Sequence, residues 1–317
     1  MASRSDAGLP FGVLLDDQTK RNSDMRLSRW NVLAASLSVV FLVGCAAAAE
    51  PPQPDFRFGV MTDIHYGDKP DAHFPTRHYR QSLDRLKDCV TDLNKRDLAF
   101  AIQCGDIIDG YGAKEVPDPK AKSLADLDTV LAEYKKLNCA QFHVLGNHEM
   151  LAGMKDVCDA LALPGGYYAF SNPKAQGWRF VVLDGNGLMV PDRAKAQLAW
   201  LEATLKQAKA DMKRVVVFCH QPLVSGLLPH SEPPPNSPAL KLIEGAGCVV
   251  ACFYGHEHVP YYSFKNGIHH VILAAMIESS KDGAYGVVEM YADHFTIVGH
   301  GWQPSMTKNF AKAAQAK

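Results

Sequence analysis

The sequence lacks the signatures of several large classes of protein. Its 33 Lys and Arg residues balance 34 Asp and Glu residues, and a formal net charge of -1 offers no basic excess for binding nucleic acid. It also has no Gly-x-x-x-x-Gly-Lys phosphate-binding loop, no Gly-x-Ser-x-Gly nucleophile elbow and no His-Glu-x-x-His zinc motif. We therefore expect no nucleic-acid partner, and no chemistry of the P-loop, serine-hydrolase or zincin kind.

The cysteine pattern excludes a disulfide framework and a thiolate metal site. The eight cysteines are scattered, none forms a Cys-x-x-Cys pair, and several lie inside apolar runs. A buried free cysteine in such a run behaves as a small hydrophobic side chain. We therefore expect neither a zinc site nor a redox site built from cysteine thiols.

The first 49 residues predict an export signal. Residues 30–49 contain no charged side chain and follow Arg26 and Arg29, which is the order of a secretory signal. Met25 is a plausible true start. The Leu-Val-Gly-Cys sequence that ends at Cys45 resembles a bacterial lipobox, in which that cysteine would be lipidated. Cleavage after a later alanine and an uncleaved membrane anchor are the alternatives. We expect an exported protein, either periplasmic or a membrane-anchored lipoprotein.

The remainder reads as one α/β domain. Apolar runs at 57–61 and 98–104 predict buried strands, and an amphipathic helix at 77–96 joins them, which indicates a parallel crossover. The alternation continues to residue 254, after which four strand-like runs predict an antiparallel meander. We expect two packed sheets with helices outside. The predicted segments are a signal-bearing extension at 1–49, a Pro-rich linker at 50–55, the domain at 56–303 and a tail at 304–317.

Five islands of acid, amide and imidazole residues each follow a predicted strand. Ligands of open α/β sheets collect at the carboxyl ends of the strands. Asp, Asn and His without Cys suit manganese, iron or zinc, and a pair of such ions suits the hydrolysis of phosphate esters and anhydrides. The islands are Asp63-Ile64-His65, Gly105-Asp106-Ile107-Ile108-Asp109, Gly146-Asn147-His148-Glu149, His220 and Gly255-His256-Glu257-His258.

This ordered set resembles the calcineurin-like metallophosphoesterase superfamily, whose pattern is D-x-H, G-D-x-x-D, G-N-H-E/D, a later H and G-H-x-H. The resemblance covers 56–302 and implies a four-layer α/β/β/α sandwich of two mixed sheets. It implies two divalent or transition metal ions, with manganese favoured over iron or zinc. His148 would protonate the leaving group, and Asp109 would orient the side chain of His148. The implied ligands are Asp63, His65 and His258 for one ion, Asn147, His220 and His256 for the other, and Asp106 between them.

A narrower resemblance is to the manganese-dependent ADP-ribose/CDP-alcohol diphosphatase branch. The stretches that carry it are 58–60 leading into Asp63-Ile64-His65-Tyr66, 77–83, 105–111, Ile277-Glu278 and Tyr285-Gly286. It implies an enzyme that hydrolyses a nucleotide-type diphosphate or phosphodiester through a hydroxide bridging the metals.

Other functions and contacts stay open at this point. The alternatives are an exported phosphomonoesterase, a cyclic-nucleotide phosphodiesterase, or a surface binding protein without catalysis. Arg77 and Arg80 are candidate phosphate contacts, because a guanidinium suits phosphate oxygens, although both also open a predicted helix. Tyr111 is a candidate for stacking on a base or sugar, although tyrosine is commonly packing. A membrane could be contacted through the lipid anchor or the signal segment.

Overall fold

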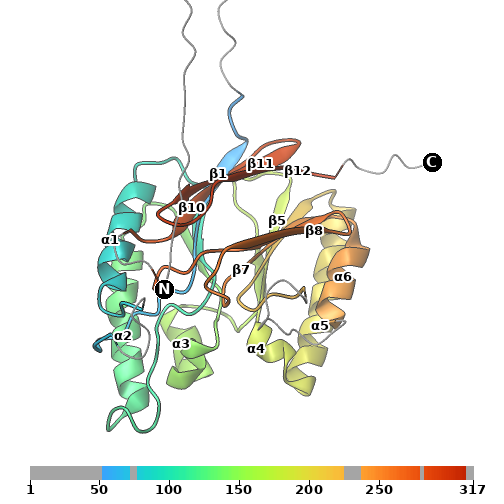
Figure 1. Ribbon diagram of the computed structural model, residues 1–317. Helices are drawn as coiled ribbons and strands as arrows, with labels where there is room; N and C mark the ends of the chain where they lie inside the picture. Colours follow the sequence, from blue (N-terminus) through green and yellow to red (C-terminus); the bar gives the residue numbers. More distant parts are fainter. Residues whose placement is uncertain (1–51, 72–76, 225–236, 279–281, 312–317) are drawn as a thin grey trace, which may run out of the picture. The chain divides into compact units, whose positions relative to one another are not determined.

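The computed structural model describes residues 52–71, 77–224, 237–278 and 282–311 (Figure 1). The predicted signal segment, with Met25 and Cys45, lies outside the described residues, as does the start of the 50–55 linker. All described residues belong to the unit Pro51–Lys317. Among them, no helix has both the length and the apolar character to cross a membrane.

The first sheet has the strand order β12-β11-β10-β1-β2-β3. β1, β2 and β3 are parallel, whereas β10 pairs antiparallel with β1, and β11 and β12 continue antiparallel beside it. The strands are β1 Phe56–Met61, β2 Phe100–Gln103, β3 Ala140–His143, β10 Tyr285–Met290, β11 His294–His300 and β12 Met306–Asn309.

The second sheet has the order β4-β5-β6-β7-β9-β8. Its four central strands are parallel, and the two edge strands, β4 and β8, pair antiparallel with their neighbours. The strands are β4 Tyr168–Phe170, β5 Trp178–Leu183, β6 Arg214–Cys219, β7 Val249–Tyr254, β8 Tyr261–Lys265 and β9 Ile268–Ile272.

Helices cover the outer face of each sheet (Figure 1). α1 Ser82–Leu93 and α2 Pro119–Tyr134 pack on the first sheet, and α5 Pro191–Ala210 and α6 Pro238–Ala246 pack on the second. The short η1 His148–Ala152, α3 Met154–Ala160 and α4 Gly185–Leu188 follow strand ends. Between the sheets lies an aromatic core that includes Phe58, Phe100, Phe180, Phe218 and Phe253. The predicted four-layer α/β/β/α sandwich is confirmed.

The structure differs from the sequence prediction at the C-terminal strands. They do not form one meander: β8 and β9 join the second sheet, where β9 is parallel to β7, while β10 and β11 join the first. Local alternation identifies a strand but not its partner, which depends on tertiary packing. β12 Met306–Asn309 pairs with β11, so the sheet extends past residue 303 into the predicted tail.

The helix boundaries also shift. The helix expected at 77–96 is α1 Ser82–Leu93, which is shorter at both ends. The start of α2 is set locally: Pro119 occupies the first helical position, and the Asp118 carboxylate accepts a hydrogen bond from the Ala121 N–H at 3.0 Å.

Candidate metal centre

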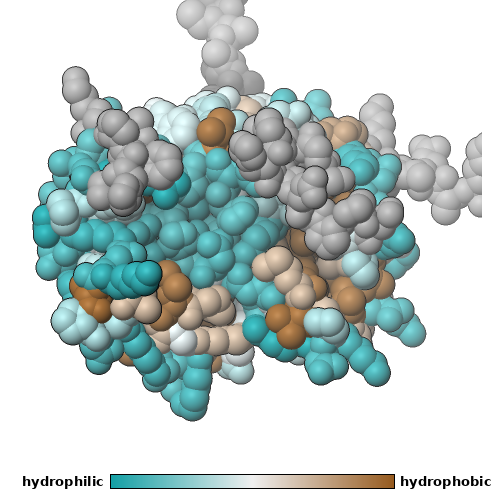
Figure 2. Space-filling model, turned by 60° about the horizontal axis from the view of Figure 1, so that its bottom comes forward, coloured by the Kyte–Doolittle hydropathy of each residue, from teal (hydrophilic) through white to brown (hydrophobic). Residues whose placement is uncertain are grey.

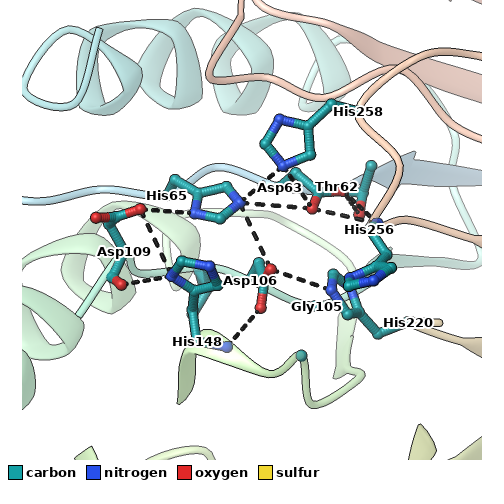
Figure 3. A network of polar contacts seen from close by, with 12 residues as sticks. Thr62, Asp63, His65, Gly105, Asp106, Asp109, His148, His220, His256 and His258 are labelled. Carbon is teal, nitrogen blue, oxygen red and sulfur yellow. Dashed lines mark hydrogen bonds and ion pairs between the residues drawn. The ribbon is translucent and has the colours of Figure 1, made fainter. Parts of the chain in front are cut away.

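The five predicted islands converge on one place (Figure 3). The loops after β1, β2 and β3 come from the first sheet, and the loops after β6 and β7 come from the second. β1 starts at the top of Figure 1 and runs downward, so these loops lie on the bottom face, which Figure 2 brings forward. That face is hollowed and hydrophilic at its centre, with hydrophobic residues along part of the rim (Figure 2).

Five of the seven predicted ligands have a left-handed backbone. Positive φ angles occur at Asp63 (50°), His65 (46°), Asp106 (52°), His256 (73°) and His258 (61°). Each such non-glycine residue costs roughly 1–2 kcal/mol, and strain of this kind persists where surrounding contacts impose it. The loops supply those contacts, because the Asp63 N–H donates to Gly105 O at 3.0 Å and the His65 N–H donates to Asp106 O at 2.9 Å.

The first ligand group consists of Asp63, His65 and His258. The Nε2 atoms of the two imidazoles are 3.1 Å apart, and each lies 3.5 Å from Asp63 Oδ1. Three donor atoms therefore face a common point, and all three lie within 4.8 Å of one another. This arrangement fits a single cation.

The second ligand group consists of Asp106, His220 and His256, whose donor atoms also lie within 4.8 Å of one another. Asp106 Oδ2 is 3.1 Å from His220 Nε2 and 3.5 Å from His65 Nε2. The same carboxylate oxygen thus reaches both groups, which is the position predicted for a bridging ligand.

Asn147 supplies a further test of whether these residues fit metal ions. Its side-chain Oδ1 is buried and has no hydrogen-bond partner among the described residues. An unpaired buried acceptor costs about 1–3 kcal/mol, so such an atom calls for an explanation. A bound cation would satisfy this oxygen, which agrees with the predicted role of Asn147 as a ligand. The residues present therefore fit two metal ions.

The outer nitrogen of three ligand imidazoles is held by an acceptor. Nδ1 of His65 is 3.0 Å from Asp109 Oδ1, Nδ1 of His220 is 2.8 Å from Cys104 O, and Nδ1 of His258 is 2.6 Å from Glu278 Oε1. In the neutral imidazole that binds a metal, a proton on Nδ1 leaves the lone pair of Nε2 facing the cluster. Contacts of this kind fix the tautomer and orientation of metal-binding histidines.

The electrostatics of the cluster favour ionised carboxylates. Burial alone would raise the pKa of Asp63, but a hydrogen bond from His65 and the charge of His258 lower that pKa to about 2. Burial would likewise raise the pKa of Asp106, and the charge of His220 instead lowers it. Burial lowers the pKa of His256 to about 4, with help from the charge of His220. Against the effect of burial, the neighbouring carboxylates raise the pKa of His65 to about 10 and that of His220 to about 9, so a bound metal ion would displace a proton from each of these imidazoles.

Glu149 ties two ligand loops together. Its fully buried carboxylate accepts hydrogen bonds from the main-chain N–H groups of Gly146 (2.5 Å), Asp106 (3.1 Å) and Ile107 (2.6 Å). In the sequence, Glu149 stands two positions after the predicted ligand Asn147, and this proximity is the signal that marks it.

The contacts of His148 and Asp109 differ in detail from the prediction. Nδ1 of His148 lies 2.6 Å from the main-chain O of Asp109 and 3.5 Å from its carboxylate. The carboxylate is closer to His65 and also pairs with Lys69. Asp109 therefore holds His148 through the backbone. Lys69 was missed, because no motif marks an isolated lysine between two islands.

The three predicted substrate contacts occupy different settings. Arg77 Nε lies 3.2 Å from Glu278 Oε1, beside the first ligand group. Arg80 is largely exposed and pairs with Asp68. Tyr111 is only 3% exposed, and its hydroxyl donates to Asp126 at 2.8 Å. Its ring is packed rather than open to a base.

Comparisons with known proteins agree with this geometry. The calcineurin-like phosphoesterase family matches residues 56–260. A manganese-dependent ADP-ribose/CDP-alcohol diphosphatase of Oryza sativa is 30% identical, over 79% of this chain and 93% of its own length. The mouse protein of the same name is 26% identical, over 84% of this chain and 97% of its own length. A crystal structure of a dimetal phosphatase from Danio rerio has the same fold, with a TM-score of 0.69 and 23% identity over 82% of this chain and 100% of that one.

Proposed function

The chain belongs to the calcineurin-like phosphoesterase family and is a metal-dependent hydrolase, and we propose that it cleaves a nucleotide-type diphosphate of the ADP-ribose or CDP-alcohol kind. The substrate class is supported by relatives with that name, which align over nearly their whole length. Manganese is the favoured metal.

The position of Asp106 is the observation that carries the proposal. One carboxylate oxygen reaches both ligand groups, as a dinuclear site requires. Bound there, two divalent ions would neutralise phosphate charge and lower the pKa of a water molecule. Each group would hold one ion. The first ion would be bound by Asp63, His65 and His258, and the second by Asn147, His220 and His256. Asp106 would be shared by both ions.

His148 would protonate the leaving group. Its side chain is 29% exposed at the edge of the cluster, and its ring meets the His65 ring edge to face at 4.5 Å between centroids. Because Nδ1 donates to the Asp109 carbonyl, Nε2 is the nitrogen left to face a substrate. A proton held at Nε2 would pass to the oxygen that leaves with one of the two phosphates.

A substrate panel tests this function. The metal-supplemented chain is assayed on ADP-ribose, CDP-choline, a cyclic nucleotide and p-nitrophenyl phosphate, and the products are resolved. We expect AMP and CMP to appear without orthophosphate. Hydrolysis of the monoester alone would identify a phosphomonoesterase, and opening of the cyclic nucleotide alone a phosphodiesterase. Binding without turnover of any of them would indicate a surface binding protein.

Export of the chain is a further part of the proposal. It is supported by the uncharged run at 30–49 that follows Arg26 and Arg29, and by the lipobox-like sequence at Cys45. Metabolic labelling with a radioactive fatty acid should label the wild-type chain and not a Cys45→Ala variant. Recovery of unlabelled wild-type chain in the cytosolic fraction would contradict both export and the membrane anchor.

A further inference from the structure

The segment from Ala275 to Glu278 joins the two loops of the first ligand group. Three consecutive main-chain N–H groups donate to those loops: Ala275 to His258 O at 3.0 Å, Met276 to Thr62 O at 3.1 Å and Ile277 to Asp63 O at 3.0 Å. The segment is therefore fixed to both sides of the group.

A buried arginine on α1 also holds the same segment. Arg85, on α1, is 3% exposed, and its Nη1 donates to Met276 O at 3.1 Å and to Ile277 O at 3.0 Å. The Trp302 indole N–H donates to Ala275 O at 3.0 Å. With its carbonyl groups paired in this way, the segment is a rigid support for the side chain of Glu278.

Glu278 presents its carboxylate to a ligand imidazole. Oε1 lies 2.6 Å from Nδ1 of His258 and 3.2 Å from Nε of Arg77. The carboxylate can accept the Nδ1–H of a neutral imidazole, and it pairs separately with the Arg77 guanidinium. In a neutral His258 held in this way, the lone pair of Nε2 faces the ligand group, 3.5 Å from Asp63 Oδ1.

We propose that Glu278 is a positioning residue for the first metal ion. Its carboxylate fixes the tautomer and orientation of His258 and links that ligand to Arg77. The inference rests on the dinuclear site of the proposed function. Asp109 stands in the same relation to His65, so each imidazole of the first group has a carboxylate on its outer nitrogen. Loss of such a partner typically lowers metal affinity by about 10–100-fold.

Manganese titration of the metal-depleted, full-length chain tests the proposal. Bound ions are counted by electron paramagnetic resonance, and affinities are measured by calorimetry. We expect the wild type to bind two ions, and Glu278→Ala to bind one of them about 10–100-fold more weakly with the other unchanged. Glu278→Gln should lose less, because its amide oxygen can still accept the Nδ1–H. If Glu278→Ala fails to fold, Glu278→Gln decides.

Two further variants serve as controls. Glu289→Gln is matched, because the Glu289 side chain is 20% exposed, as Glu278 is, and pairs with Arg57 on the first sheet, where it contacts no ligand. It should bind both ions normally. Arg77→Gln leaves the contact between Glu278 and His258 in place and should retain both ions.

Wild-type affinity for both ions in Glu278→Ala would overturn the inference. That result is distinct from failure of the proposed function, in which the wild type binds two ions and cleaves no diphosphate. Metal binding is read without any substrate, so the two failures cannot be confused.

Discussion

The carboxylate of Glu149 accepts a hydrogen bond from the main-chain N–H of Asp106, at 3.1 Å, and so fixes the backbone of the predicted bridging ligand from the loop that carries Asn147. The two residues are 43 positions apart and follow different strands. Any shift of Glu149 would displace both loops.

Glu149→Gln should therefore destabilise the fold. The new amide group would face main-chain N–H donors that now share a carboxylate, and an unpaired buried donor costs about 1–3 kcal/mol. Urea unfolding measures the change in the free energy of unfolding. Glu133→Gln is the control, since Glu133, near the end of α2, pairs with the exposed Lys136 just beyond the helix, and such a pair contributes at most about 1 kcal/mol. Equal effects of the two substitutions would contradict the role given to Glu149.

His148→Asn should lower kcat without weakening manganese binding. Proton transfer by a positioned side chain contributes about 10²–10⁴-fold, so a loss in that range is expected for the diphosphate substrate. Steady-state kinetics and a metal titration are measured together. His294→Asn is a matched control, because that side chain is 23% exposed, close to the 29% of His148, and lies on β11. An unchanged kcat in His148→Asn would remove this residue from the reaction.

Removal of metal should lower the thermal midpoint, and Asn147→Ala should reduce that dependence. A ligand at about 100 times its dissociation constant stabilises a fold by about 2.7 kcal/mol. Thermal unfolding with a chelator and with added manganese gives the shift. Asn172→Ala, which loses hydrogen bonds to Ala99 O and from the Lys174 N–H but touches no ligand, should retain the wild-type shift. A full shift in Asn147→Ala would exclude that residue as a ligand.

Acid should destabilise the chain in part through His143, on β3. Burial, with a smaller effect of Lys135, lowers the pKa of this imidazole to about 3 from an unfolded value of 6.5. Between those values the unfolded chain binds a proton that the folded chain does not, so stability falls as pH falls below about 6.5. At pH 5 the loss is at most about 2 kcal/mol, from 1.36 kcal/mol per pKa unit.

His143→Phe isolates this contribution, because a phenyl ring can keep the contact with Tyr134 but cannot titrate. Urea unfolding at about pH 7.5 and about pH 5 should show a smaller difference in the variant than in the wild type. An identical pH dependence would show that His143 does not contribute.

The order of the polar islands was readable from the sequence because each follows an apolar strand. Parallel strands place their carboxyl ends at one edge, so Asp63, Asp106 and Asn147 were expected to meet. The predicted family is confirmed, and so are the fold and the hydrolase class. The substrate contacts were less predictable. Tyr111 has a ring suited to stacking, but only packing decides whether such a ring is exposed, and here it is buried.

The sequence by itself therefore determined the strands, the metal-binding residue types and the class of reaction, since all three depend on local pattern and side-chain chemistry. The tertiary structure decided which sheet each late strand joins and which residues hold the ligands from outside. Glu278 meets His258, Asp109 meets His65, and the His256 N–H donates to Asp63 Oδ2 at 3.0 Å across 193 positions. Contacts of this kind depend on the packing of two sheets, which no local pattern encodes.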